Sequence, residues 1–164
     1  MKKILLIVFT MISLLLFGKE VRKEDLEERS GVMYEIATGK PYTGTSLIYD
    51  GEFLNTRSEY KNGLLDGKTT IYNYNNNISI ETTMRKGQQN GSTKVYYDSG
   101  KLRASGTFKN GKIEGVSKEY HENGRVMTEG RYKNGHEHGL FQEYDENGNL
   151  INKINYENGK IINK

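Results

Sequence analysis

The chain of 164 residues contains no cysteine, no tryptophan and a single proline. Without cysteine it forms no disulfides, carries no lipid on a lipobox cysteine and has no thiol nucleophile. Hydrophobic residues make up only 34% of the sequence, and the mean hydropathy is -0.78. This composition argues against a thick globule with a conventional closed core. Stability must therefore come from hydrogen bonds and packing alone.

Long apolar runs are also lacking, apart from Ile4 to Phe17, which follows Lys2 and Lys3. This run is shorter than the about 20 residues that a membrane-spanning helix needs. A short basic region before a short apolar run is typical of a secretory leader. We therefore expect residues 1–18 to be a signal peptide of an exported protein, which would be periplasmic, at the cell surface or secreted. An uncleaved N-terminal anchor is the alternative.

Neither sign of charge predominates. The formal net charge is +3, and setting aside Lys2 and Lys3 in the leader leaves 22 basic against 21 acidic residues. Basic and acidic side chains are interleaved along the sequence, whereas a nucleic-acid footprint needs basic residues clustered on one face. We expect no nucleic-acid partner and no membrane contact beyond the leader, because no basic patch is present to meet anionic headgroups.

Glycine and tyrosine are abundant, with nineteen and twelve residues, and they recur at a period of 24. Each copy has an aromatic residue or Met, two glycines four apart, a tyrosine, and a glycine or asparagine. The central copy reads Phe108, Gly111, Gly115, Tyr120, Gly124, and the register holds from residue 60 to residue 159. A fixed period of about 20 to 50 residues indicates a repeat array. Function then belongs to the surface of stacked copies rather than to a catalytic cluster.

The chain divides into three predicted regions. Residues 1–18 form the leader, residues 19–30 form a charged linker or marginal helix, and residues 31–164 form the array. The first copy is atypical, contains Pro41 and has the character of a capping repeat. The predicted copies are 31–59, 60–83, 84–107, 108–131, 132–155 and the partial copy 156–164.

Within each copy the polarity alternates with a period of two, which is typical of strands with one apolar and one solvated face. In the central unit the predicted faces are Leu102, Ala104, Gly106, Phe108 and Arg103, Ser105, Thr107, Lys109. The segment from Tyr97 to Lys101 predicts a three-residue hairpin loop closed by a glycine at positive φ, so that Tyr96 opposes Leu102. The equivalent pairs are Tyr72–Ile78, Tyr120–Val126, Tyr144–Leu150 and Tyr49–Leu54.

These features predict an all-β fold, an elongated antiparallel meander of hairpins in an open single-layer sheet. The two glycines of each copy are expected in the wider turn between hairpins, where glycine adopts the left-handed conformation. No lysine–serine pair or helix start follows them, so they are structural rather than a phosphate loop. The predicted turn glycines are Gly63, Gly67, Gly87, Gly91, Gly111, Gly115, Gly135 and Gly139.

The recurring aromatic residues are the candidate partner-binding face. In a one-layer sheet their rings stay half exposed, and tyrosine is favoured at recognition surfaces because it offers large contact area at low entropic cost. The same rings could simply hold neighbouring hairpins together, and both roles can coexist. The candidate residues are Tyr72, Tyr96, Tyr120, Tyr144, Phe108 and Tyr132.

Other chemistry is weakly represented. His136 and His138 flank Glu137, but a zinc site needs three or four ligands, and equivalent positions elsewhere hold unrelated residues. The segment beginning at Asp145 lacks the downstream bidentate acid of a calcium loop. No carboxylate pair stands apart from the repeat, and no Gly-x-Ser-x-Gly elbow occurs. We expect no catalytic residues, no metal and no cofactor.

The recurring Tyr-Lys-Asn-Gly-x-x-x-Gly, followed by Tyr and then Asn-Gly, resembles the variant class of MORN repeats over about 125 positions. It is similar in particular to bacterial exported multi-repeat proteins, which are often labelled antitoxin components of toxin–antitoxin systems. Only His138–Gly139 matches the His-Gly pair of the eukaryotic consensus. The resemblance implies a β-hairpin array that acts as a scaffold or recognition surface without enzymatic activity.

Three functional hypotheses follow. The first is an exported, non-catalytic protein that binds a protein partner, on a host or neighbouring cell or in its own envelope, through the tyrosine-lined face. The second is an antitoxin-like or immunity-like neutraliser of a partner toxin. The third is a structural component that self-associates through exposed edge strands, since an open sheet leaves unpaired backbone groups at its ends.

Overall fold

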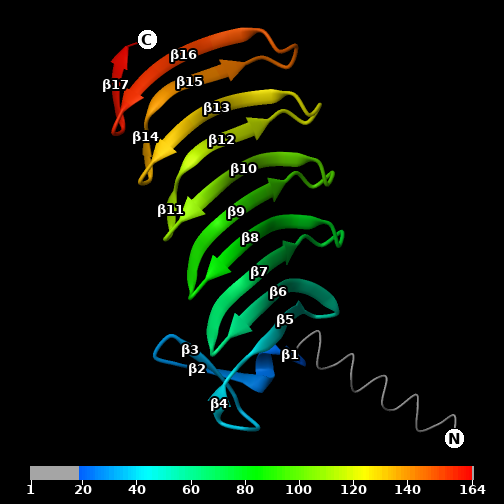
Figure 1. The fold of residues 1–164 in the computed structure, drawn as a ribbon. Coiled ribbons are helices and arrows are strands. Elements are labelled where there is room, and N and C mark those ends of the chain that lie inside the picture. Colours follow the sequence, from blue (N-terminus) through cyan, green and yellow to red (C-terminus); the bar gives the residue numbers. More distant parts are fainter. Residues whose placement is uncertain (1–18, 164) are drawn as a thin grey trace, which may run out of the picture.

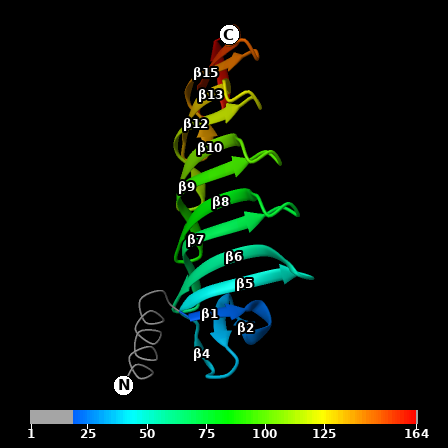
Figure 2. The ribbon, with the colours of Figure 1, turned by 90° about the vertical axis from the view of Figure 1, so that its right-hand side faces the viewer.

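The computed structural model describes residues 19–163 as an almost entirely β-structure. A 14-stranded sheet runs the length of the molecule, and a three-stranded sheet lies at its N-terminal end (Figure 1). Seen from the side, the long sheet is a single layer of successive hairpins (Figure 2). The predicted all-β meander is confirmed. Within residues 19–163 no helix is both long and apolar enough to span a membrane, and the predicted leader, residues 1–18, lies outside the described residues.

The order of strands in the long sheet is β1, β5 to β10, β12, β13, β15, β16 and β17, while β11 and β14 pair with β10 and β13. Among the strand pairings of residues 19–163, only β1–β5 is parallel. The bounds in the long sheet are β1 Lys19–Arg22, β5 Gly44–Asp50, β6 Phe53–Lys61, β7 Leu64–Tyr72, β8 Ile78–Arg85, β9 Gln88–Tyr96, β10 Leu102–Lys109, β11 Lys112–Ile113, β12 Gly115–Tyr120, β13 Val126–Lys133, β14 His136–Glu137, β15 Gly139–Tyr144, β16 Leu150–Glu157 and β17 Lys160–Asn163. The small sheet consists of β2 Leu26–Arg29, β3 Val32–Glu35 and β4 Lys40–Pro41, with the 3-10 turn η1 at Lys23–Asp25.

Two-residue turns join the hairpins along one edge of the sheet, which we call the turn edge. In the central turn Asn110 has φ 50° and Gly111 has φ 76°. Positive φ at both residues defines a type I′ turn, whose twist matches that of the flanking strands and which favours Asn-Gly. The turns of this edge are Asn62–Gly63, Lys86–Gly87, Asn110–Gly111, Asn134–Gly135 and Asn158–Gly159.

The second glycine of each copy does not lie in these turns, contrary to the sequence-based expectation. Gly67 and Gly91 lie inside β7 and β9, and Gly115 and Gly139 begin β12 and β15, with φ between 83° and 130°. The register explains the difference, because Phe108 pairs with Ile113 whereas Ser105 pairs with Lys118. Two extra residues therefore bulge out of the later strand, and the glycine supplies the left-handed conformation that the bulge needs.

Three-residue loops close the opposite edge, the loop edge, as the sequence predicted. The Tyr97 amide donates to the Lys101 carbonyl at 2.9 Å, and Gly100 has φ 81°. The predicted cross-strand pairs are all present in the register of the sheet, although Tyr49 and Leu54 flank a shorter turn. They are Tyr49–Leu54, Tyr72–Ile78, Tyr96–Leu102, Tyr120–Val126 and Tyr144–Leu150.

Each turn of the turn edge is hydrogen-bonded to the hairpin before it. The Gly111 amide donates to the Gln89 carbonyl at 2.9 Å, and Gly135 donates to Ile113 at 3.0 Å. The turn glycines 63, 87 and 159 donate in the same way at 2.7 to 2.9 Å. Each turn is thus held by a backbone hydrogen bond that does not depend on side-chain identity. The same bond satisfies the amide of the turn glycine.

Side chains make the corresponding contacts on the loop edge. The Tyr97 hydroxyl donates to the Tyr120 carbonyl at 2.6 Å, and one copy later His121 Nε2 lies 2.8 Å from the Tyr144 carbonyl. Lys101 Nζ also donates to the Glu122 carbonyl at 2.8 Å. Successive loops are therefore tied together by bonds from a side chain to the next loop's backbone.

The buried hydrophobic core of the described residues lies at the N-terminal end. It consists of Val21, Leu26, Met33 and Tyr42, each 8% exposed or less, with Tyr60 packed against it. The segment expected to be a charged linker, residues 19–30, instead forms β1, η1 and β2. Val21 and Leu26, its only apolar residues, both turn into this core while the charged residues stay in solvent. The prediction failed because β1 is held by a long-range pairing with β5, which local charge patterning does not reveal.

The predicted first copy, residues 31–59, is divided between the two sheets. Residues 32–41 contribute β3 and β4 to the small sheet, and the long sheet resumes at Gly44. The Met33 amide donates to the Gly63 carbonyl at 2.8 Å, and the Gly63 amide donates to the Tyr42 carbonyl at 2.7 Å. The small sheet thus closes the N-terminal end of the turn edge.

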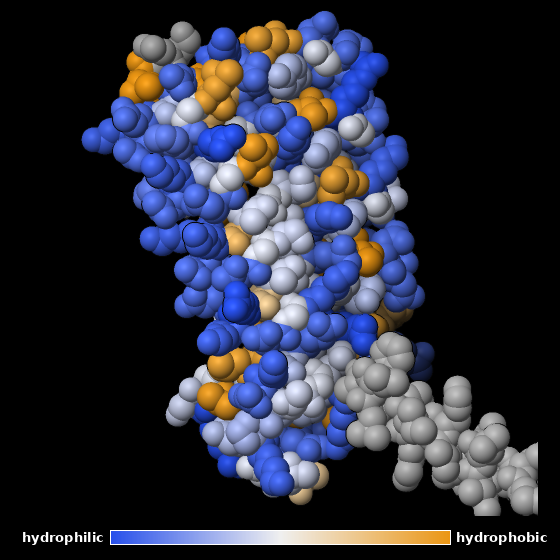
Figure 3. Space-filling model, in the orientation of Figure 1, coloured by the Kyte–Doolittle hydropathy of each residue, from blue (hydrophilic) through white to orange (hydrophobic). Residues whose placement is uncertain are grey.

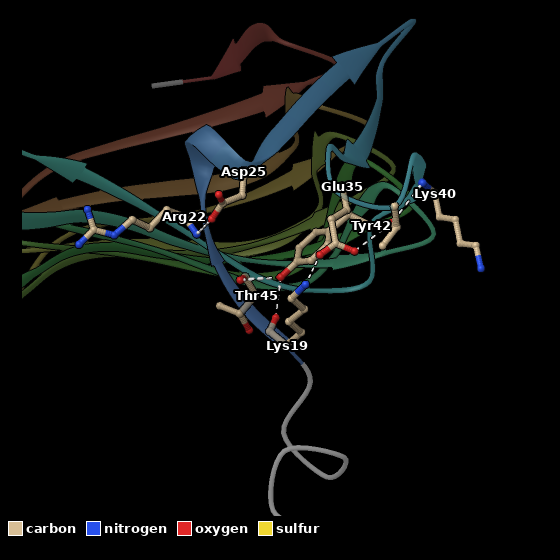
Figure 4. Close-up of polar contacts among 8 residues, drawn as sticks. Lys19, Arg22, Asp25, Glu35, Lys40, Tyr42 and Thr45 are labelled. Carbon is tan, nitrogen blue, oxygen red and sulfur yellow. Dashed lines mark hydrogen bonds and ion pairs between the residues drawn. The ribbon is translucent and has the colours of Figure 1, made fainter. Parts of the chain in front are cut away.

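Tyr42 joins the small sheet to the long one (Figure 4). Its hydroxyl lies 2.6 Å from the Lys19 carbonyl and 2.7 Å from the Thr45 carbonyl, while the Lys19 ammonium pairs with Glu35. The ring is 2% exposed. A Cβ at Gly44 would collide with the Tyr42 hydroxyl and the Lys19 carbonyl, so glycine is required there. Burial, and secondarily Glu35 and Glu20, raise the pKa of Tyr42 to about 12.

We predict that Tyr42 makes stability fall at high pH. The raised pKa means that the fold favours the neutral phenol, so its contribution is complete below pH 10 and is lost as the pH rises through about 12. A shift of this size corresponds to about 2 to 3 kcal/mol. Denaturant unfolding of the native chain and of Tyr42→Phe, measured from pH 9 to 12, should show the two free energies of unfolding converging. Parallel curves would contradict this role.

Candidate functional site

The two faces of the long sheet differ in chemistry. Lys68, Thr70 and Tyr72 share one face of β7, and Thr70 is the register partner of Glu81. By the same alternation and register, Tyr96, Tyr120 and Tyr144 lie on this face, which we call the tyrosine face. The opposite face carries Thr82, Thr93, Gly106, Ser117 and Gly130 in its middle row, and we call it the small-residue face.

The candidate partner-binding set is therefore split. Tyr72, Tyr96, Tyr120 and Tyr144 lie next to the loop edge on the tyrosine face, whereas Phe108 and Tyr132 lie near the turn edge on the small-residue face. Sequence alternation placed Leu102 with Phe108, but β10 has an irregularity between Leu102 and Ala104. Leu102 pairs with Tyr96, and Ala104 pairs with the adjacent Val95. The side chains of Leu102 and Ala104 therefore lie on opposite faces of the sheet.

The tyrosines lie among paired charges rather than on an apolar surface. Tyr96 donates from its hydroxyl to Glu81 Oε2 at 3.1 Å, and Lys68 Nζ lies 2.9 Å from Glu81 Oε1. Two copies further on, Lys118 pairs with Glu129 at 2.9 Å. Burial, followed by the hydrogen bond to Glu81, raises the pKa of Tyr96. The tyrosine face thus combines aromatic rings with charges of both signs.

The small-residue face is polar across its middle. Thr82 Oγ1 and Thr93 Oγ1 lie 2.7 Å apart, and Gln89 Nε2 donates to Thr82 at 3.3 Å. Figure 3 shows a pale stripe of intermediate hydropathy along the long axis of the molecule, with hydrophobic patches and blue margins beside it.

Near the C-terminal end this pattern is broken by an aromatic cluster of Tyr132, Phe141 and Tyr156. The ring centroids of Phe141 lie 5.3 Å from Tyr132 and 5.0 Å from Tyr156, both edge to face. The Phe141 ring covers Gly130, where a Cβ would collide with it. Phe141 was not among the sequence candidates. The signal that could have identified it is its position in the repeat, which holds Thr69, Thr93 and Ser117 in earlier copies.

A hollow of about 140 Å³ lies beside this cluster. Its lining combines the apolar Phe141, Ile154 and Tyr156 with the polar Thr128, Glu143 and Asn152. Asn152 Nδ2 lies 3.5 Å from Glu143 Oε2, and Thr128 donates to Glu119 Oε2 at 3.2 Å. The hollow is smaller than a pocket for a drug-sized ligand, which occupies about 300 to 1,000 Å³.

The histidines do not come together as a site. The His138 amide donates to the Arg131 carbonyl at 2.8 Å, and His121 belongs to the loop edge. Within residues 19–163 no group of three or more histidines and carboxylates is placed to hold a metal ion. Asp145 accepts hydrogen bonds from Asn147 and Asn149 within its own loop, and the bond from Asn149 contributes most to lowering its pKa.

Comparison with known proteins identifies the repeat. The family model of the MORN repeat variant matches three consecutive segments, residues 89–110, 113–134 and 137–158. MORN repeats are associated with protein and membrane binding, and they are not an enzyme family. No curated protein sequence matches the chain. Among solved structures, one chain of the "Crystal structure of GtfA/B complex" aligns with 14% identity and a TM-score of 0.33, over 82% of this chain and 22% of that chain.

We predict that two equivalent glycines respond differently to alanine. Gly130 and Gly106 occupy the same repeat position, but a Cβ at Gly130 meets the Phe141 ring whereas one at Gly106 meets Ser117 Oγ at 3.4 Å. Overpacking should make Gly130→Ala cost about 1 to 3 kcal/mol of unfolding free energy, and Gly106→Ala less than about 1 kcal/mol. Thermal and denaturant unfolding of both variants test this. Equal losses would mean that Phe141 does not pack on Gly130.

Proposed function

From the premise that this chain is built of MORN-variant repeats over residues 89–158, we propose that it is a non-catalytic scaffold that binds a protein partner on its tyrosine face. The observation that carries this proposal is the single-layer sheet, which presents a periodic row of half-buried tyrosines to solvent. The row consists of Tyr72, Tyr96, Tyr120 and Tyr144. Export, expected from residues 1–18, would place the partner in the envelope or outside the cell.

The chemistry of the tyrosine face supports a protein ligand. Protein interfaces are enriched in tyrosine and combine an aromatic centre with polar surroundings. Here Tyr96 is held by its bond to Glu81, and the Lys118–Glu129 pair lies beside Tyr120. A partner can therefore bury rings that are already positioned, so less conformational entropy is lost on binding.

The periodic spacing supports an extended rather than a compact epitope. Successive tyrosines are separated by two strands, which corresponds to about 10 Å across the sheet. Several moderate contacts at this spacing act together, because the second contact occurs at the high effective concentration set by the first. An elongated or repetitive partner segment fits such a row best.

We predict that replacing two central tyrosines weakens partner capture. Three proteins would be immobilised: the full chain, the double variant Tyr96→Ser/Tyr120→Ser and the control Tyr74→Ser. Each would be incubated with envelope and secreted fractions, and the proteins that bind would be cross-linked to it and quantified. Tyr74 is 72% exposed in a loop, so its loss removes a tyrosine without changing the row. Capture by the double variant should fall about fivefold or more, since truncating interface hot spots costs more than 1 kcal/mol each.

The folded state of the variants is checked by circular dichroism and thermal unfolding. If the folded double variant captures the same partners as the native chain, the tyrosine face is not the binding surface. If Tyr74→Ser loses capture to the same extent, the loss of capture reflects the number of tyrosines rather than their position in the row.

A further inference from the structure

The repeat sequence changes on the small-residue face in the last two complete copies, 108–131 and 132–155. One position reads Ile71, Val95, Glu119 and Glu143 at successive steps of 24 residues, and a neighbouring one reads Thr69, Thr93, Ser117 and Phe141. The register places these positions in adjacent rows of the same face. The aliphatic row becomes acidic at Glu119, and the small residue becomes aromatic one copy later, at Phe141.

The carboxylates have no evident role in forming the sheet, unlike Phe141, which packs in the aromatic cluster. Earlier copies build the same hairpins with Val95 in place of Glu119 and with Thr93 in place of Phe141. A carboxylate contributes less to strand packing than valine does, since β-branched residues suit a half-buried pleated surface. Replacing valine by glutamate beside an aromatic cluster therefore suggests a requirement for binding rather than for folding.

The electrostatics of the hollow beside Phe141 favour a cation. Glu143 lines it, and Glu119 reaches its wall through the hydrogen bond from Thr128. Neither carboxylate forms an ion pair within residues 19–163, and the small-residue face of β12, β13, β15 and β16 carries no lysine or arginine. Burial raises the pKa of the neighbouring Tyr132, with Glu137 and Glu119 as further causes.

The aromatic walls favour the same kind of ligand. Cations bind against aromatic rings through the negative potential of the ring face, and arginine does so more often than lysine. Phe141, Tyr156 and Glu143 all line the hollow. A guanidinium inserted here can contact a ring while hydrogen bonding to the carboxylate. The volume of about 140 Å³ suits one long side chain.

We propose that the hollow formed by Phe141, Glu143, Asn152 and Tyr156 is a binding subsite for a positively charged side chain, an arginine or lysine, of the protein partner. The proposal deepens the proposed function and rests on it for the source of the ligand. The subsite lies on the face opposite the tyrosine row, so a partner that uses both surfaces would wrap around the sheet.

The test uses small probes, so that it does not depend on knowing the partner. N-acetyl-L-arginine amide and its neutral isostere N-acetyl-L-citrulline amide are titrated into the full chain, and backbone amide shifts are followed by NMR. The arginine probe should give saturable shifts confined to residues near 128, 141–143 and 152–156. The citrulline probe should bind about threefold to tenfold more weakly, because it lacks the charge.

Two charge-neutralising variants test which carboxylate the arginine probe contacts. Glu143→Gln keeps the size of the side chain and should weaken the arginine probe about threefold or more. Glu129→Gln removes the same charge on the tyrosine face, where Glu129 pairs with Lys118, and should leave binding unchanged. Phe141→Leu should also weaken the probe, with folding checked by thermal unfolding.

Several outcomes would overturn the subsite. Arginine and citrulline probes of equal affinity, no saturable shifts with the arginine probe, or equal weakening by Glu129→Gln and Glu143→Gln would each do so. Saturable shifts with a neutral disaccharide such as cellobiose, in the absence of arginine binding, would reassign the hollow to carbohydrate. Partner capture by the tyrosine row could persist in all these cases, so failure here leaves the proposed function separately testable.

Discussion

The backbone hydrogen bonds that each hairpin shares with its neighbours are the interaction on which the rest of this structure depends. A single layer has no second sheet or helix to cover it, so most side chains of the long sheet remain partly exposed. The type I′ turns allow each turn glycine to donate to the preceding hairpin, as Gly111 does to Gln89. Because this bond needs only a positive φ, the side chains of the two faces remain free to vary between copies.

The N-terminal end of the array is capped by a small buried core and a parallel strand. There the chain makes a buried core from Val21, Leu26, Met33 and Tyr42, and β1 pairs with β5 in parallel. The edge strand of the described sheet is then the short and charged β1 rather than β5, and such a strand is a poorer template for unwanted pairing. The hydroxyl of Tyr42 contacts carbonyls of both Lys19 and Thr45, so the small sheet and the long sheet are joined through one buried polar group.

The repeated part of this fold was readable from the sequence, and the parts that differ from the repeat were not. The period of 24 gave the meander and the pairing of Tyr96 with Leu102, because loop length sets hairpin register. Alternation alone failed at Leu102, since a bulge moves a side chain to the other face without changing composition. The core residues Val21 and Leu26 looked like part of a charged linker, because their partners lie far away in sequence.

Departures from the period are therefore the most informative positions in this chain. Where every copy needs the same turn and the same pairing, the residues that satisfy them recur, so their repetition says little about binding. The departures at the N-terminal end have a folding explanation, since they build the cap. Phe141 packs over Gly130, whereas Glu119 and Glu143 have no such explanation, because earlier copies form hairpins with aliphatic residues at this position. The two carboxylates beside the aromatic cluster are therefore the departures on which the proposed subsite rests.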